Sequence, residues 1–177
     1  MFDTLMLFVV PTLVLRLLGF AGVRRFATWR VASAHGLTFM FTMTGLAHFA
    51  PASAPVVPSH ADMVAMVPPA IPFADFAVYA TGVLELAGAV GLIFAATRRW
   101  TGIGLAALLV VMVPANIYAG LEDIPLGDDP ATPLWFRIPE QIVYFGLALW
   151  VAGALPLGRD NRSDTVSTYQ PSGSAAG

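Results

Sequence analysis

The chain contains no cysteine and no lysine, and charged side chains make up only 11% of its 177 residues. Without cysteine, the chain by itself cannot form a disulfide, exchange thiols, ligate an iron–sulfur cluster or build a thiolate zinc site. Hydrophobic residues make up 57%, which leaves too little polar surface to cover a water-soluble globule of this size. A net charge of −2 and this hydrophobicity also exclude a nucleic-acid partner. The composition therefore predicts a protein whose partner is the lipid bilayer.

Five apolar segments are long enough to cross a bilayer, since roughly 20 residues span the hydrocarbon core as a helix. They cover residues 4–23, 31–50, 74–96, 101–119 and 136–155. The first segment resembles a signal peptide in length, but Asp3 precedes it and its arginines follow it. This order of charges favours a retained helix. We therefore predict an all-α fold, a polytopic bundle of membrane helices.

Positive charge is confined to alternate connections between these segments. Seven of the nine arginines occur in three groups: Arg24, Arg25 and Arg30; Arg98 and Arg99; Arg159 and Arg162. The other connections carry acidic residues, and arginine-rich loops of membrane proteins remain in the cytoplasm. The pattern predicts a multi-pass protein of the cell membrane with its N-terminus outside and its C-terminus in the cytoplasm.

The longest external connection, residues 51–73, contains six prolines around a short apolar run. Ser59 followed by Asp62 has the spacing of a capping box, and Pro68 and Pro69 would end a helix that starts there. We expect a short helix at the outer membrane surface. The alternative is a proline-rich linker without an ordered helix. At the other end of the chain, the small and polar residues 157–177 are expected to be a disordered cytoplasmic tail.

Glu85 lies near the middle of the third segment, on one helical face with Thr81 and Gly88. A single carboxylate at this depth is expected to be protonated or paired, because burying an unpaired charge in lipid is very costly. Arg16, near the middle of the first segment, is a candidate partner. In the alternative interpretation, Arg16 extends to the cytoplasmic headgroups and Glu85 only joins two helices through a hydrogen bond.

A second set of polar residues is predicted in the outer half of the membrane, on the second, fourth and fifth segments: His48, Asn116, Arg137, Gln141 and Tyr144. Pro114 should free the carbonyl of Val110 and kink the fourth helix nearby. With Glu85, these side chains are candidates for one ligand-binding pocket that opens to the outside and has donors for a small polar group or a quinone carbonyl. The alternative is a network solvated by headgroups. No metal site is expected, and no residue is assigned to catalysis. The candidates are His48, Glu85, Asn116, Arg137, Gln141 and Tyr144.

Two pairs of small residues predict close packing between the third and fourth segments. They are Ala87 with Gly91 and Gly102 with Ala106, each spaced four residues apart. Small residues at this spacing let two membrane helices approach each other closely.

Five short motifs together resemble those of DoxX-like integral membrane proteins. They are TGLAHF at 44–49, MVPPAIP at 66–72, TGVLELAGAVGL at 81–92, VPANIYA at 113–119 and RIPEQ at 137–141. The resemblance implies a four-helix membrane core over residues 31–156, preceded by an extra N-terminal transmembrane helix and cytoplasmic connection over residues 1–30. It carries over His48, Glu85, Pro114, Asn116, Arg137 and Gln141 as recurrent motif positions. Glu140 departs from the family pattern, which has an apolar residue there, and we expect it to pair with Arg137.

The resemblance implies a link to membrane redox chemistry, since some DoxX-like proteins are associated with quinone-linked sulfur oxidation or membrane redox complexes. We expect an accessory subunit of such a process, with a membrane-associated redox protein as partner and quinone as a candidate ligand. The sequence leaves open whether the protein is an enzyme. One alternative is a proton-coupled carrier of a small molecule or lipid, with Glu85 as its protonatable gate. A purely structural membrane partner is the other.

Overall fold

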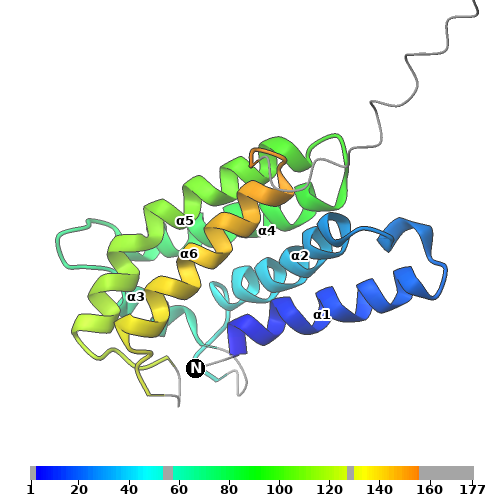
Figure 1. Cartoon of the computed structure of the whole chain (residues 1–177). Helices are drawn as coiled ribbons and strands as arrows, with labels where there is room; N and C mark the ends of the chain where they lie inside the picture. Colours follow the sequence, from blue (N-terminus) through cyan, green and yellow to red (C-terminus); the bar gives the residue numbers. More distant parts are fainter. Residues whose placement is uncertain (1–2, 54–57, 127–129, 156–177) are drawn as a thin grey trace, which may run out of the picture.

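The computed structural model describes residues 3–53, 58–126 and 130–155, and it is built from helices, as predicted. The long helices lie side by side along roughly a common direction (Figure 1). The predicted tail, together with Asp128, Asp129, Arg159 and Arg162, lies outside the described residues. The elements are α1 (Asp3–Phe20), a 3₁₀ turn η1 (Arg24–Phe26), α2 (Trp29–Ala47), α3 (His60–Ala65), α4 (Ala74–Ile93), α5 (Arg98–Leu121) and α6 (Leu134–Val151).

Helix α2 is central, since it packs against α1, α4 and α6, while α5 packs against α4 and α6. Successive long helices run antiparallel, so their connections fall at two opposite ends of the bundle (Figure 1). We call one the acidic end; there α2 and α5 finish and α4 and α6 start. The opposite one, with η1 and the connection from α4 to α5, is the basic end. The acidic end carries Asp62, Asp75, Glu122 and Asp123, and the basic end carries Arg24, Arg25, Arg30, Arg98 and Arg99.

Four of the described helices, α1, α2, α4 and α6, end three or four residues before their predicted segments, and glycine is the reason in α1 and α6. Gly22 and Gly153 have positive φ angles of 103° and 74°, which residues with a Cβ rarely adopt. Beyond Gly22, the Val23 amide donates to the Leu18 carbonyl, and beyond Gly153 the Ala154 amide donates to the Leu149 carbonyl. These are Schellman caps. They end α1 at Phe20 and α6 at Val151, whereas the predicted segments reach residues 23 and 155.

The predicted short helix in the connection between α2 and α4 is confirmed as α3. The Ser59 side chain accepts from the Asp62 amide, and the Asp62 carboxylate accepts from the Ser59 amide at 2.8 Å, which completes the capping box. Because the backbone amides of Ser59 and Asp62 both find a side-chain acceptor at the start of the helix, the helix forms despite the surrounding prolines.

The core is apolar and lies along α2, α4, α5 and α6, where Leu37, Met40, Leu92 and Leu105 are its largest fully buried side chains. The predicted small-residue pairs are only partly confirmed. Gly91 lies against Thr101 of α5, as expected. Ala87, however, is exposed, and Gly102 contacts α6 near Ala148 and Ala152 instead of α4. The four-residue spacing therefore did not determine which of these small residues face another helix, or which helix they face.

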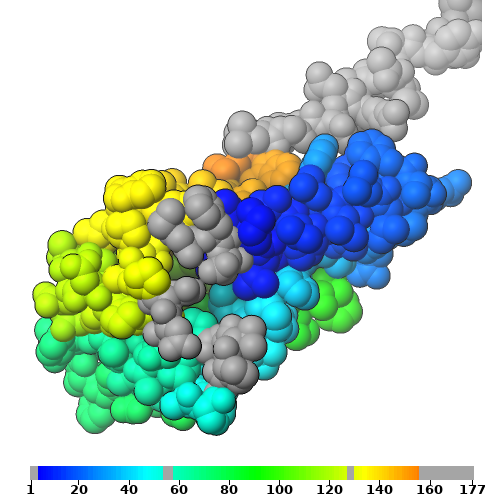
Figure 2. All heavy atoms as spheres, turned by 90° about the horizontal axis from the view of Figure 1, so that it is seen from below, coloured from blue at the N-terminus to red at the C-terminus, as the bar shows by residue number. Residues whose placement is uncertain are grey.

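Large apolar side chains cover the outside of the bundle as well as its interior. Helix α1 (blue) lies on the surface along one side of the molecule (Figure 2). On α1 the exposed fractions include 65% for Leu17 and 70% for Phe20, and α4 exposes 74% of Phe76. Of the described helices, α4 and α5 are each long and apolar enough to cross a membrane, and α1 is apolar but shorter. Such an exterior is typical of membrane association.

Candidate functional site

The predicted site residues fall into two clusters, one between α2 and α4 and one between α5 and α6. His48 and Glu85 are joined through contacts between α2 and α4. Asn116, Arg137, Gln141 and Tyr144 belong to the interface of α5 with α6. Among the described residues, no hydrogen bond or ion pair connects the two groups. The described contacts therefore divide the candidates for the predicted pocket between two groups, which we call the Glu85 cluster (Thr44, His48, Thr81 and Glu85) and the Arg137 cluster (Asn116, Arg137, Glu140, Gln141 and Tyr144).

Glu85 is buried inside the bundle, with 3% of its surface exposed. The Thr44 hydroxyl of α2 donates to its Oε2 atom at 2.6 Å, and that hydroxyl is also 3.1 Å from the Met40 carbonyl oxygen. One hydroxyl carries one hydrogen, so it cannot donate fully to both oxygens. A protonated Glu85 that donates to Thr44, while Thr44 donates to Met40, satisfies both contacts.

His48 caps the C-terminus of α2 and is buried against α4. Its Nδ1 atom is 2.7 Å from the Val78 carbonyl oxygen, which can only accept, so Nδ1 carries the hydrogen. In a neutral ring, the lone pair of Nε2 is then free, and Nε2 lies 3.7 Å from Glu85 Oε1. Gly82 makes this approach possible, because a Cβ there would lie 2.5 Å from the Cβ atom of His48.

The pairing of Arg16 with Glu85, considered from the sequence, is not observed. Arg16 instead donates to the Phe26 carbonyl at 3.2 Å, and its guanidinium lies over the rings of Phe20 and Trp29 at 4.0 and 5.2 Å. These contacts lie toward the basic end of the bundle. The alternative interpretation, in which Arg16 extends toward that end, agrees with the structure.

Three residues beside the Glu85 cluster were not predicted as part of a site. The His60 Nδ1 atom of α3 is 2.8 Å from the His48 carbonyl oxygen, and its Nε2 atom is 3.3 Å from Asp75 Oδ1. The His60 ring also stacks on Tyr79, with centroids 4.0 Å apart. The capping box in the sequence predicted α3, but it did not predict which part of the bundle α3 packs against. The structure shows that α3 is fixed over the end of α2 that holds His48.

In the Arg137 cluster, the guanidinium is almost fully buried, with 6% exposed. Arg137 Nη1 donates to Asn116 Oδ1 at 3.1 Å, and Nε donates to the Thr132 carbonyl at 3.4 Å. Asn116 in turn donates to the Met112 carbonyl at 3.2 Å. Both acceptors of Arg137, the Asn116 amide oxygen and the Thr132 carbonyl, are neutral, so its hydrogen bonds position this cation without neutralising it.

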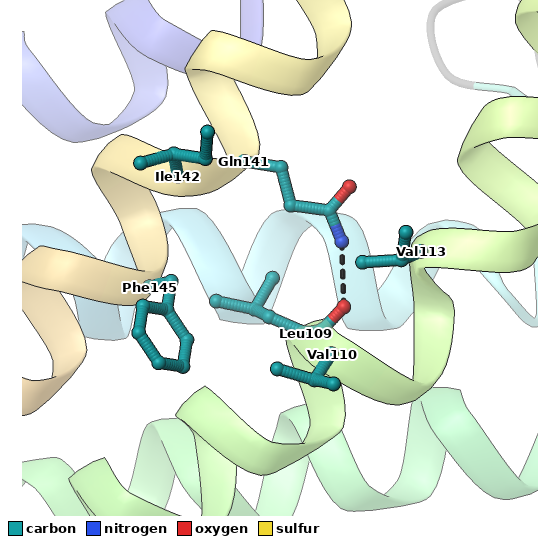
Figure 3. A pocket seen from close by; sticks show the side chains of 6 residues that line it. All are labelled: Leu109, Val110, Val113, Gln141, Ile142 and Phe145. Atoms are coloured by element: carbon teal, nitrogen blue, oxygen red, sulfur yellow. Dashed lines mark hydrogen bonds between the residues drawn. The ribbon is translucent and has the colours of Figure 1, made fainter.

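Gln141 links α6 to the backbone of α5 near Pro114. Its Nε2 atom donates to the Leu109 carbonyl at 2.6 Å (Figure 3). The sequence predicted that Pro114 would leave the Val110 carbonyl free. The hydrogen bond from Gln141 is instead accepted by the Leu109 carbonyl, one residue earlier. Beside it lies an open groove of about 200 Å³ between the two helices, lined by Leu109, Val110, Val113, Gln141, Ile142 and Phe145 (Figure 3).

Glu140 and Tyr144 complete the cluster. The Tyr144 hydroxyl donates to Glu140 Oε1 at 2.7 Å, across one turn of α6. The expected ion pair of Glu140 with Arg137 is absent from the contacts of these two described residues. Glu140, which departs from the family pattern, therefore accepts from Tyr144, and its charge acts on Arg137 without a direct ion pair.

Two buried polar atoms of the Arg137 cluster lack a hydrogen-bond partner in the described part of the chain. They are Arg137 Nη2, a donor, and Gln141 Oε1, an acceptor. A buried unpaired polar atom costs roughly 1–3 kcal/mol, so natural proteins rarely leave one without a reason. Arg137 and Gln141 are four residues apart on α6, and both contact α5, so the unpaired atoms belong to one interface.

A family model for a domain of unknown function (DUF8561) matches residues 37–152, about two thirds of the chain. The chain belongs to this family. The DUF8561 match begins within α2 and ends one residue beyond α6, so it contains both clusters and leaves out α1. The chain matches no curated protein and no solved structure.

Proposed function

We propose that this chain is a DoxX-like, multi-pass integral membrane protein that serves as an accessory subunit of a membrane redox process. Its ligand is a quinone or another small lipophilic molecule, bound where α5 and α6 meet at the Arg137 cluster. In this proposal the acidic end, with the N-terminus, faces outside, and the basic end, with the C-terminus, faces the cytoplasm.

The exterior of the bundle supports the membrane part of the proposal. Large apolar side chains are exposed on every long helix, among them Leu17 of α1, Phe39 of α2, Val83 of α4, Val111 of α5 and Ile142 of α6. Water would solvate such a surface poorly, whereas lipid tails solvate it well. Five of the described arginines lie at the basic end and four carboxylates lie at the acidic end, which supports the orientation because arginine-rich connections remain on the cytoplasmic side.

The observation that carries the ligand proposal is the pair of unpaired buried atoms at the interface of α5 and α6, where one of the two residues, Gln141, lines an apolar groove. A quinone carbonyl accepts hydrogen bonds and suits Arg137 Nη2, while the hydroxyl of the reduced quinol also donates and suits Gln141 Oε1. The groove, at about 200 Å³, is below the roughly 300–1,000 Å³ of pockets for drug-sized ligands. It therefore fits a ring or a short stretch of isoprenoid chain rather than an entire ligand.

The redox role and the partner come from the resemblance to DoxX-like proteins. The described residues include no cysteine, and the whole sequence has none, so electron transfer through thiols would belong to the partner. This is why we propose an accessory subunit rather than an oxidoreductase by itself.

The test is to purify the protein from membranes in mild detergent, extract it with organic solvent and quantify quinone by chromatography. We expect quinone in the wild-type extract and at least a tenfold lower amount in Arg137→Gln and Gln141→Leu, because a lost bond to a charged or buried group costs about 1.5–3 kcal/mol. Arg99→Gln is the matched control, since Arg99 is exposed at the basic end and lies near Trp100.

Equal quinone in the wild type, the two cluster variants and the Arg99 control would contradict the ligand proposal. Co-purification in the same detergent tests the partner. The accessory role is supported if a redox protein is recovered with the wild-type chain and is lost in high salt or from the Arg137→Gln and Gln141→Leu variants. Reproducible isolation of the chain alone from native membranes counts against that role.

A second candidate function is a proton-coupled carrier that uses Glu85. It is favoured by the shared Thr44 hydroxyl and by the free Nε2 of His48, 3.7 Å from the carboxylate, which together give one proton two places to reside. Glu85→Gln keeps the shape and the acceptor oxygen but removes the titration. If the Glu85→Gln variant folds and accumulates normally, but proteoliposomes that contain it no longer take up the transported molecule in response to a pH gradient, the carrier function is supported. If uptake by the wild type shows no pH dependence, Glu85 serves only to join α2 and α4.

A further inference from the structure

Three arginines from separate elements gather at the basic end of the bundle. Arg25 belongs to η1, Arg30 to α2 and Arg98 to α5. The charges of Arg25 and Arg30 both act on Arg98, and those of Arg25 and Arg98 act on His35 of α2. Arg25 contacts His35 directly at 3.1 Å, and the charges of the group are close enough to act on one another although as many as 73 positions separate the residues in the sequence. Neither the proposed ligand site nor the Glu85 cluster involves them.

Each of these guanidinium groups is held in place by neutral acceptors. Arg30 Nε donates to the Trp150 carbonyl at 3.1 Å, at the C-terminus of α6. Arg98 Nε donates to the Leu92 carbonyl at 3.0 Å, at the C-terminus of α4. The helix ends offer a partial negative charge, which positions a cation favourably but does not neutralise it.

Arg25 is fixed through His35 rather than through a backbone carbonyl. The His35 Nδ1 atom is 2.8 Å from the Val31 carbonyl oxygen, so Nδ1 carries the hydrogen and Nε2 is free to accept. Arg25 Nη2 lies 3.1 Å from that Nε2 atom. The contact uses one N–H group of the guanidinium and leaves its other donors available for a ligand.

The positive charge of this group has no opposite charge nearby among the described residues. No carboxylate in the described ranges forms an ion pair with Arg25, Arg30 or Arg98. The acidic side chains Asp62, Asp75, Glu122 and Asp123 lie at the other end of the bundle. These three cations repel one another, and no carboxylate among the described residues offsets their charge, so the group favours an anion as its ligand.

We propose that Arg25, Arg30 and Arg98 form a binding site for the phosphate of an anionic phospholipid headgroup. This inference rests on the proposed membrane embedding, because the site then lies at the cytoplasmic headgroup layer, where anionic lipids concentrate. Guanidinium groups bind phosphate oxygens through paired N–H donors, and basic pockets between transmembrane helices are suited to such headgroups. The apolar surface of the neighbouring helices accommodates the acyl chains.

The test uses the full chain in a neutral detergent, with mixed micelles that contain equal amounts of phosphatidylglycerol and phosphatidylcholine. After removal of free lipid, the retained lipids are quantified by mass spectrometry. We expect the wild type to retain phosphatidylglycerol preferentially. Arg25→Gln combined with Arg98→Gln should weaken this retention about thirtyfold, since each arginine near an anionic headgroup contributes about a factor of five.

The matched control combines Arg24→Gln with Arg99→Gln. It removes the same charge from neighbouring positions, but neither residue is among those whose charges act on Arg98. We expect near wild-type retention in this variant. If the first double variant does not fold, Arg25→Gln alone is compared with Arg24→Gln, and about a fivefold difference is expected.

Equal loss in both double variants would overturn the proposal, because the effect would then reflect net charge only. Equal retention of the two lipids by the wild type would overturn it as well. Millimolar inorganic phosphate is added in a separate arm, and displacement of phosphatidylglycerol by it would assign the site to free phosphate instead of lipid. None of these outcomes affects the membrane proposal, which fails only if the chain is extracted from membranes and stays dispersed without detergent.

Discussion

The Glu85 and Arg137 clusters are both buried toward the acidic end of the bundle, but they differ in how completely they are bonded. In the Glu85 cluster, the carboxylate and the imidazole face partners from α2 and α4. In the Arg137 cluster, Nη2 of Arg137 and Oε1 of Gln141 are buried without a partner in the described structure. In the first cluster the polar side chains face one another, with His48 Nε2 at 3.7 Å from Glu85 Oε1, whereas the second has two buried atoms without a partner and retains bonding capacity for another molecule.

This difference assigns different roles to residues of similar chemical type. A closed polar cluster inside a bundle contributes to stability and can hold a proton, but it offers little to a ligand. An incomplete cluster lowers stability and is expected to be completed by a ligand. Mutations should therefore affect mainly stability in the Glu85 cluster and mainly ligand content in the Arg137 cluster.

The largest effect is expected from Gly82→Leu, which would break the Glu85 cluster. Even a Cβ at this position would lie 2.5 Å from the Cβ of His48, so a leucine must displace the imidazole from Val78. We expect a loss of about 3 kcal/mol in stability or failure to fold, measured by thermal unfolding in detergent. Gly104→Leu is the control, because nothing lies within 4 Å of a Cβ there. Similar melting temperatures for the two variants would contradict the described packing.

The next largest effect is expected from Thr44→Val, which keeps the shape of the side chain and removes the hydroxyl that contacts Glu85. Leaving this buried carboxyl without its 2.6 Å partner should cost about 2 kcal/mol of unfolding free energy. Thr42→Val provides the comparison, since its hydroxyl bonds to the Thr38 carbonyl within its own helix. We expect that variant to lose less than about 0.5 kcal/mol. Equal losses in chemical unfolding would mean that Thr44 contributes nothing specific to Glu85.

For the Arg137 cluster, Gln141→Leu should change stability by only about 1 kcal/mol. The substitution removes the bond to the Leu109 carbonyl but also removes the unpaired Oε1 atom, so the two effects partly offset each other. The quantity to compare is the ratio of lost ligand to lost stability, measured on the same preparation as Thr44→Val. If Gln141→Leu is strongly destabilised and still keeps its ligand, the Arg137 cluster contributes mainly to stability, and the distinction between the two clusters is reversed.

Much of the fold could be predicted from the sequence, because apolar length and the position of arginine reflect simple physical requirements. The five apolar segments correspond to α1, α2, α4, α5 and α6, with ends that differ by a few residues. The capping box at Ser59 was sufficient to predict α3. The early ends of α1 and α6 depend on glycines in the left-handed conformation, and a glycine in an apolar run does not show that conformation by itself.

The candidate site was harder to predict, because the cost of burying a polar group identifies residues but not their partners. Glu85, His48, Arg137 and Gln141 are all buried, which agrees with that argument. Their division between two helix pairs depends on which face each helix turns toward its neighbours. The sequence spacing left this undetermined, as it did for Gly102. His60 could not be recognised, since its contacts depend on how α3 folds back over α2.

The smallest effect is expected from Asp75→Asn, at the edge of the Glu85 cluster. Asp75 Oδ1 lies 3.3 Å from His60 Nε2, but its side chain is 78% exposed, and exposed ion pairs typically contribute well under about 1 kcal/mol. We expect less than about 0.5 kcal/mol, seen as a small shift in chemical unfolding that disappears at high salt. His60→Ala should cost more, because it also removes the bond to the His48 carbonyl and the stacking on Tyr79. If Asp75→Asn is as destabilising as His60→Ala, the ion pair rather than the backbone bond fixes α3, and the closure of the Glu85 cluster would depend on a surface charge.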